Sequence, residues 1–151
     1  MTSSDSLRER QEIEDVVVRL FVATDRRDWA SVEACLDNMV ILDMTSLAGG
    51  EPLHMKPIDV IAVWKGGLEP IDQVHHQVGN FQIDVDGNRA TAFCYGVAYH
   101  YRENISSPSK TRTFVGSYDV HLTRTGAKWR IDLFRFNVKF IEGNRELEKA
   151  T

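Results

Sequence analysis

Residues 75–102 read HHQVGNFQIDVDGNRATAFCYGVAYHYR, two long alternating runs on either side of Asp86-Gly87-Asn88. Alternation of this kind predicts β-strands, and Asp and Gly tolerate the positive backbone angles of a tight turn, so the stretch predicts a β-hairpin. Residues 111–125 and 128–141 repeat the pattern around a single glycine, and the loop at 103–110 joins the two hairpins. Four long antiparallel strands are therefore expected in the second half of the chain.

The first half of the chain has helical spacing instead. Apolar residues recur every three or four positions from Leu7 to Asp28, which is typical of an amphipathic helix. Asp28 is a suitable N-cap for a second helix over 29–37, residues 39–44 predict a short strand, and 56–67 predict a third helix that begins with a proline. The fold class is therefore α+β, a cone in which about three N-terminal helices pack in a curved, mostly antiparallel sheet around a pocket.

Length and composition narrow the class of protein further. With 151 residues we expect one domain over 1–151, with a flexible N-terminus at about 1–8. The net charge of -4 provides no basic surface for nucleic acid. No apolar stretch is long enough for a membrane span, and residues 1–15 are too polar for a signal peptide, so a cytoplasmic protein is expected. Cys35 and Cys94 lack metal-ligand spacing and are expected to be buried free thiols.

Asp25 is the informative polar residue of the first helix. Counting back four positions from Asp25 gives Phe21, and three more gives Val18, so the carboxylate projects near the edge of the apolar stripe. An unpaired buried carboxylate costs several kcal/mol, so a histidine or arginine is expected beside it. A local cap or ion pair at the helix end would explain the same residue.

The adjacent pair His75 and His76 raises the question of which imidazole faces the core. Successive strand residues point to opposite faces, so the two cannot both bind one metal, and no metal site is expected. His75 shares the parity of the apolar residues that begin at Phe81, which would turn His75 inward unless a bulge near Gly79 changes the phase. Periodicity alone leaves both arrangements open. With no glycine-rich phosphate loop and no CxxC motif, no cofactor is expected.

His100 ends the next strand, and one face of that strand carries only small residues. Small side chains beside a histidine are typical of a cavity wall, although close packing against a helix explains the pattern equally well. The small residues are Ala90, Ala92, Cys94, Gly96 and Ala98. The opposite face is largely aromatic.

The order of these segments resembles the SnoaL-like family of the nuclear transport factor 2 fold over nearly the whole chain. The resemblance rests on a first helix followed by the motifs VATDRRDW (22–29), VHHQVGN (74–80), DGNRATAFCYGVAYHY (86–101) and GSYDVHLTRTGAKWRI (116–131). Members include scytalone dehydratase, γ-hexachlorocyclohexane dehydrochlorinase, polyketide cyclases, ketosteroid isomerase and non-catalytic domains. Fold alone does not fix function.

The resemblance implies a catalytic Asp-His pair. Asp25 matches the family's aspartate late in the first helix, and His76 stands four residues before Asn80, as the dehydrochlorinase histidine stands before an asparagine, which favours His76 over His75. His100 matches a further histidine of the dehydratase on the following strand. We also expect substrate contacts from Phe21, Trp64, Asn80 and Tyr118.

These residues imply a cofactor-independent lyase or isomerase that acts on a small cyclic or polyketide-like substrate. The carboxylate of Asp25 would fix the imidazole tautomer, His76 would remove a proton from carbon, and His100 would protonate a departing hydroxyl or else lie in solvent. The alternative is a non-catalytic domain that binds a small apolar or aromatic ligand, or an assembly domain like the small subunits of ring-hydroxylating dioxygenases.

A homodimer is expected through the outer face of the sheet, because three helices cannot cover both faces of so long a sheet. The apolar positions of the last strand on which this expectation rests are Phe134, Phe136, Val138 and Phe140.

Overall fold

Helices occupy the first part of the chain and long strands the second. The computed structural model describes residues 2–151. Its elements are α1 (Ser3–Asp25), α2 (Trp29–Cys35), β1 (Leu36–Asp43), α3 (Thr45–Ala48), β2 (Leu53–Met55), α4 (Pro57–Leu68), β3 (Gln73–Asp86), β4 (Arg89–Tyr101), β5 (Thr111–Thr125), β6 (Lys128–Gly143) and the short 3-10 helix η1 (Leu147–Lys149).

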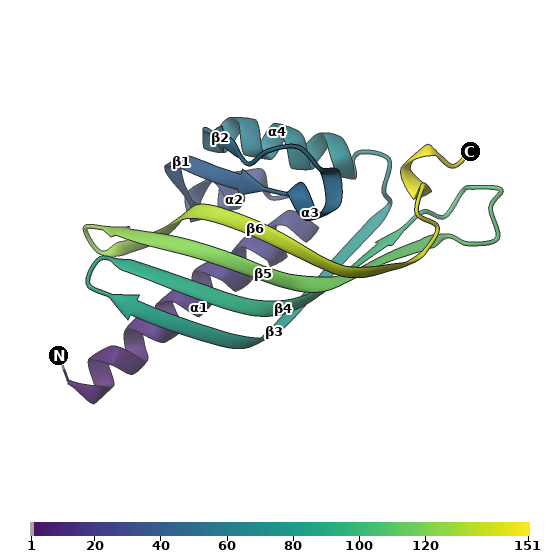
Figure 1. Cartoon of the computed structure of the whole chain (residues 1–151). Coiled ribbons are helices and arrows are strands. Elements are labelled where there is room, and N and C mark those ends of the chain that lie inside the picture. Colours follow the sequence, from purple (N-terminus) through teal and green to yellow (C-terminus); the bar gives the residue numbers. More distant parts are fainter. Residues whose placement is uncertain (1) are drawn as a thin grey trace.

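The six strands form one curved sheet in the order β2-β1-β6-β5-β4-β3. Neighbouring strands are antiparallel except β1 and β6, which run parallel. Figure 1 shows α1 running along one face of the long strands, while α4 lies beside β1 and β2. The predicted α+β class with helices against a curved sheet is confirmed. Within residues 2–151, no helix is long and apolar enough to cross a membrane.

The ends of α1 differ from the predicted ones for local reasons. The helix begins at Ser3, before the predicted Leu7, because Thr2 and Asp5 form a capping box in which each side chain accepts from the backbone of the other residue. Residues 3–8, expected to be flexible, are therefore helical. The helix ends at Asp25 because Arg27 adopts a left-handed backbone with φ 54°. Asp28 then caps α2 as predicted, accepting a hydrogen bond from the Ser31 N–H.

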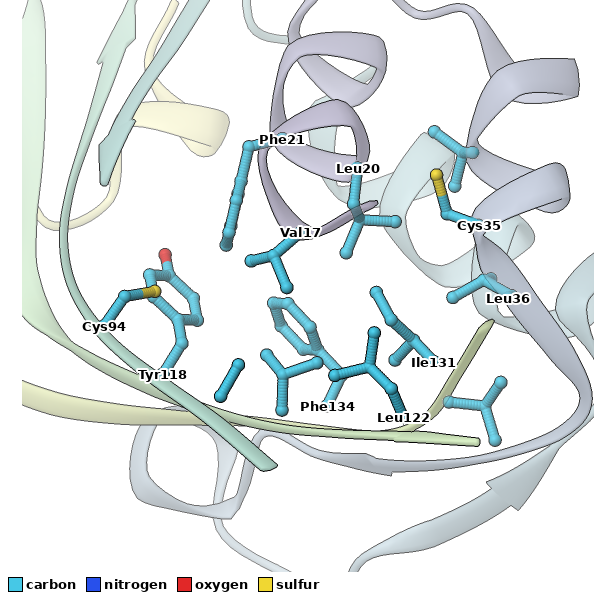
Figure 2. Packing of buried hydrophobic residues seen from close by; sticks show 14 of the residues in the cluster. Val17, Leu20, Phe21, Cys35, Leu36, Cys94, Tyr118, Leu122, Ile131 and Phe134 are labelled. Carbon is cyan, nitrogen blue, oxygen red and sulfur yellow. The ribbon is translucent and has the colours of Figure 1, made fainter. Parts of the chain in front are cut away.

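The core lies between α1 and the concave face of the sheet. Figure 2 shows Val17, Leu20 and Phe21 of α1 facing Leu122, Ile131 and other side chains of β5 and β6. Cys35 and Cys94 are both buried and unbonded to each other, as expected, and burial raises the pKa of both thiols. This packing anchors α1 by its apolar stripe and fixes the direction of Asp25 at its C-terminal end.

A bulge in β3 decides which histidine faces inward. The pairing of β3 with β4 shifts between Gly79 and Gln82, and Asn80 inside the shift has a left-handed backbone with φ 56°. His76 and Ile83 have opposite parity in the sequence, yet both face the interior because the bulge changes the phase between them. His75 is exposed on the outer face. Of the two arrangements that the sequence left open, the structure has the bulged one.

Candidate active site

The helices and the curved sheet enclose a cavity of about 540 Å³. Its wall is mostly apolar and includes Phe21 from α1, Trp64 from α4 and Phe134 from β6. Polar side chains enter the wall at a few positions, among them His76, His100, Arg112 and Tyr118. A concave apolar site of this size with a few polar groups is typical of small-molecule binding.

Asp25 and His76 form a close pair at this cavity. The Nδ1 atom of His76 lies 2.6 Å from Oδ1 of Asp25, and the His76 backbone N–H donates to Oδ2 at 2.7 Å. Both carboxylate oxygens thus bind the same residue, and the two side chains are only 14% and 17% exposed. When the carboxylate accepts from Nδ1–H, the free lone pair of the neutral imidazole is on the other ring nitrogen, Nε2. The predicted contact is present, and Asp25 is not a local helix cap.

Aromatic rings hold the position of His76. The Phe21 ring lies 5.2 Å from the His76 ring, between centroids, and 4.7 Å from the Tyr118 ring in an edge-on arrangement. Tyr118 in turn lies against β4, where a Cβ atom on Gly96 would come within 2.2 Å of its ring. Burial raises the pKa of the Tyr118 phenol, so this group is a hydrogen-bond donor at neutral pH.

The small residues of β4 therefore serve two purposes. Ala90, Ala92 and Cys94 are buried in the core, whereas Gly96 makes room for the Tyr118 ring and Ala98 lines the cavity. Close packing therefore explains the small residues in the first half of β4, and the cavity wall explains Ala98 near its end.

His100 lines the cavity beside an arginine that the sequence analysis did not single out. Nη2 of Arg112 lies 3.2 Å from Nδ1 of His100, and the Phe114 ring packs edge-on against the imidazole at 5.2 Å. Burial, and next the positive charge of Arg112, lower the pKa of His100 to about 4. The imidazole is therefore neutral at neutral pH.

Asp25 binds His76 without lining the cavity itself, and Asn80 is the predicted site residue that lies away from the cavity. Its side chain is exposed, and its left-handed backbone forms the β3 bulge. Asparagine tolerates this conformation better than most residues, so its contribution is to the phase of the strand. Phe21, Trp64, His76, His100 and Tyr118 all line the cavity, and Asp25 reaches it through His76.

Three charged side chains of the cavity were missed. Arg112 begins the inward face of β5, and Arg145 and Glu148 come from the C-terminal segment. Arg112 is only 8% exposed, donates to the Arg145 carbonyl at 3.1 Å and pairs with the Glu148 carboxylate. The alternation of β5, which places Arg112 on the same face as Phe114 and Tyr118, was an available signal for Arg112. The turn of η1 carries no comparable pattern.

Helices packed in a curved sheet around an apolar cavity, with an Asp-His pair beside it, are the features of a small-molecule-binding α+β domain. A family model described as a SnoaL-like domain matches residues 5–135, so the chain belongs to the SnoaL-like domain family. This confirms the resemblance inferred from the sequence. A comparison with the curated proteins found no match.

Solved structures share the fold at low sequence identity. A protein from Kribbella flavida is 21% identical, with a TM-score of 0.90 over 96% of this chain and 99% of its own. A scytalone dehydratase-like protein from Novosphingobium aromaticivorans is 14% identical, with a TM-score of 0.81 over 95% and 93%. The hexachlorocyclohexane dehydrochlorinase LinA-type3 from Novosphingobium barchaimii is 12% identical, with a TM-score of 0.79 over 95% of each chain.

Proposed function

We propose that this protein is a cofactor-independent lyase or isomerase in which His76 removes a proton from carbon. The observation that carries the proposal is the 2.6 Å contact between His76 and Asp25 at the wall of an apolar cavity. A paired, partly buried imidazole is a suitable general base, because the carboxylate holds one tautomer and stabilises the imidazolium that forms. The structural neighbours named as a dehydrochlorinase and as dehydratase-like support the same class of reaction, since both names describe eliminations.

The proposed mechanism uses the free Nε2 lone pair of His76. That nitrogen takes a proton from a carbon made acidic by an adjacent carbonyl, and the electron pair of the broken C–H bond forms a C=C bond. The carbonyl π pair moves to oxygen and gives an enolate. Asp25 keeps its hydrogen bond to Nδ1 and faces the new positive charge without itself reacting. The enolate then either takes a proton at another carbon or expels a group from the β carbon.

The shape of the cavity favours a small ring compound. A space of about 540 Å³ is suited to a molecule of two or three fused rings rather than to a polymer. Aromatic side chains form much of its surface, and Trp64 and Phe134 meet edge-on at 5.3 Å. Such walls offer stacking and edge contacts to planar apolar ligands.

Hydrogen exchange provides the direct test of this function. Wild-type protein in heavy water is expected to speed deuterium uptake into an enolisable cyclic ketone, or elimination from a cyclic β-hydroxy ketone, above the rate in buffer. The panel should contain indanone, tetralone and decalone, and binding of each should be measured separately by calorimetry. If members of the panel bind in the cavity and exchange no faster than in buffer, the protein is instead a small-molecule-binding or assembly domain.

We also propose a homodimer that forms through the outer face of the sheet. The side chains that carry this proposal differ from the predicted ones, because Phe134 and Phe136 face the core and only Phe140 of that set is strongly exposed, at 49%. Tyr95 and Tyr99 of β4 are also about half exposed on this face. Apolar rings gathered on one uncovered sheet face are typical of a protein contact.

Light scattering tests the dimer. Wild-type protein at micromolar concentration is expected to have twice the mass of one chain, and Tyr99→Asp is expected to be monomeric, because the new charge would be buried unpaired at the contact. Leu7→Asp is the matched control, since Leu7 is an exposed apolar residue of α1 remote from the sheet face. A monomeric wild type, or an unchanged Tyr99→Asp dimer, would reject this arrangement.

A further inference from the structure

The contact between Arg112 and His100 defines the protonation of the second cavity histidine. A guanidinium has only N–H donors, so at 3.2 Å from Arg112 Nη2 the Nδ1 atom of His100 must be the acceptor. An imidazole that accepts at Nδ1 is neutral and carries its proton on Nε2. Within residues 2–151, that Nε2 atom has no hydrogen-bond partner, while the ring itself lines the cavity.

We propose that Arg112 is a positioning residue that holds His100 as a neutral donor, whose Nε2–H binds the carbonyl oxygen of an enolisable ketone. This inference rests on the proposed function, because it assigns the oxygen of the substrate that loses its proton to His76. It differs from the role expected for His100, which was to protonate a departing hydroxyl.

The surroundings of Arg112 leave it little freedom. Its Nη1 donates to the Arg145 carbonyl at 3.1 Å and pairs with the Glu148 carboxylate, and its guanidinium lies 5.0 Å from the centre of the Phe114 ring. These partners come from β5 and from the C-terminal segment, so two parts of the chain fix the direction of Nη2. The Glu148 carboxylate also offsets the buried positive charge.

The charged and titratable groups around His100 support a neutral imidazole. Arg112 from β5 and His76 from β3 lower its pKa, and Asp25 from α1 and Glu148 from the C-terminal segment oppose them. Burial is the largest cause, and together these effects bring the pKa to about 4. His100 is therefore uncharged across the range in which the protein would work.

The two histidines are placed to act on one substrate. His76 pairs with Ala98, and His100 pairs with Val74 two residues away, so the imidazoles lie on the same face of adjacent strands as diagonal neighbours. The backbones of such diagonal positions are about 7 to 8 Å apart, and both imidazoles line the cavity, so one small ligand can contact both rings. In the arrangement we propose, the α carbon of the ketone lies at His76 Nε2 and its carbonyl oxygen at His100 Nε2–H.

In this arrangement the two histidines have different roles, because His100 binds the oxygen and His76 moves the proton. When the C–H pair becomes a C=C bond and the carbonyl π pair moves to oxygen, the enolate oxygen accepts a stronger hydrogen bond from His100, which keeps its proton. His76 holds the abstracted proton and is the group that returns it, to carbon in an isomerisation or to the leaving oxygen in an elimination. A substrate without a carbonyl would gain nothing from His100.

Nitrogen-15 NMR of histidine-labelled protein tests the tautomer without any turnover. The wild-type His100 signals are expected to show an unprotonated Nδ1 and a protonated Nε2 from about pH 6 to about pH 8. In Arg112→Met the preference should weaken toward that of a free imidazole, and the pKa of His100 should rise because the neighbouring positive charge is gone. In Arg112→Lys, which keeps a cationic donor, both should be largely retained. Arg102→Met is the matched control, because Arg102 also binds the C-terminal segment, at the Leu147 and Ala150 carbonyls, without contacting His100.

The oxygen contact is tested with β-naphthol, a flat bicyclic compound whose single oxygen resembles that of an enol. Binding of β-naphthol should move the His100 Hε2 resonance downfield. Separately, His100→Phe should lower the rate of ketone exchange by about a hundredfold to a thousandfold. His100→Gln should lower that rate less, because glutamine keeps an N–H donor. A proton on Nδ1 in the wild type, failure of β-naphthol to bind, or binding without a shift would overturn the inference. Because these signals need no turnover, they can hold even if no ketone in the panel exchanges, which would refute only the proposed reaction.

Discussion

Replacing His76 with alanine is expected to slow deuterium exchange into a bound ketone by about a hundredfold to ten-thousandfold, the usual effect of removing one positioned base. The residual rate would come from the cavity, which still binds and polarises the ketone. The protein should stay folded, because the His76 side chain lies at a cavity wall and the backbone N–H at position 76 still donates to Asp25 in the variant. The rate is measured by proton NMR in heavy water, with circular dichroism to confirm folding.

Two further variants make this result specific to the pair. Asp25→Asn should cost a comparable factor, because the amide can donate to Nδ1 and stabilise the wrong imidazole tautomer. His75→Ala should leave the rate unchanged, since His75 is the adjacent histidine but is exposed on the outer face of the same strand. Exchange by His76→Ala as fast as by wild type would refute the enzyme proposal, and a large loss in His75→Ala would mean that the β3 phase is wrong.

The sequence predicts the features that depend on local patterns. Two hairpins with Asp-Gly and Gly turns predict the long strands, and the helical phase of Asp25 together with the cost of burying a carboxylate predicts a partner for it. The structure contains both, and the partner is His76. Alternation along β4 indicates an inward face of small residues, of which Ala98 and His100 line the cavity and Ala90, Ala92 and Cys94 pack in the core.

The features that the sequence does not predict depend on contacts between distant segments. The inward direction of His76 requires the bulge at Asn80, which periodicity allows but does not demand. The tautomer of His100 depends on Arg112, twelve positions later, and Arg112 is itself held by Glu148 from the C-terminal segment. α3 and β2 are too short to give a periodic signal, and the parallel pairing of β1 with β6 joins opposite ends of the chain.

The outer face of the sheet shows the same limit. Simple alternation places Phe136 and Phe140 of β6 on one side, yet Phe136 is buried and Phe140 is exposed. The pairing of β5 with β6 shifts between Val115 and Gly116, so the side chains of β6 beyond the shift point to the opposite face from the one that alternation predicts. One irregular step in the ladder therefore moves an aromatic ring from the cavity side to the proposed dimer face.

This step in the ladder depends on Gly116, and Gly116→Ala is expected to destabilise the protein by about 3 kcal/mol or more, in the range of severe overpacking. A Cβ atom there would lie 2.1 Å from the Asn137 carbonyl oxygen and 2.8 Å from Cε2 of Phe136. The first of these atoms belongs to the backbone, so relief requires β5 and β6 to separate next to the cavity wall.

Equilibrium unfolding in urea at one fixed protein concentration measures the loss of stability. Gly79→Ala is the matched control, because Gly79 is also a strand glycine beside a register shift, but a Cβ atom there would meet nothing within 4 Å. That change is expected to be neutral or stabilising by up to about 1 kcal/mol, since alanine restricts the unfolded chain more than glycine. Equal stabilities for the two variants would show that the β5–β6 ladder can yield at Gly116, and the close approach of the strands would then not be what sets the direction of Phe140.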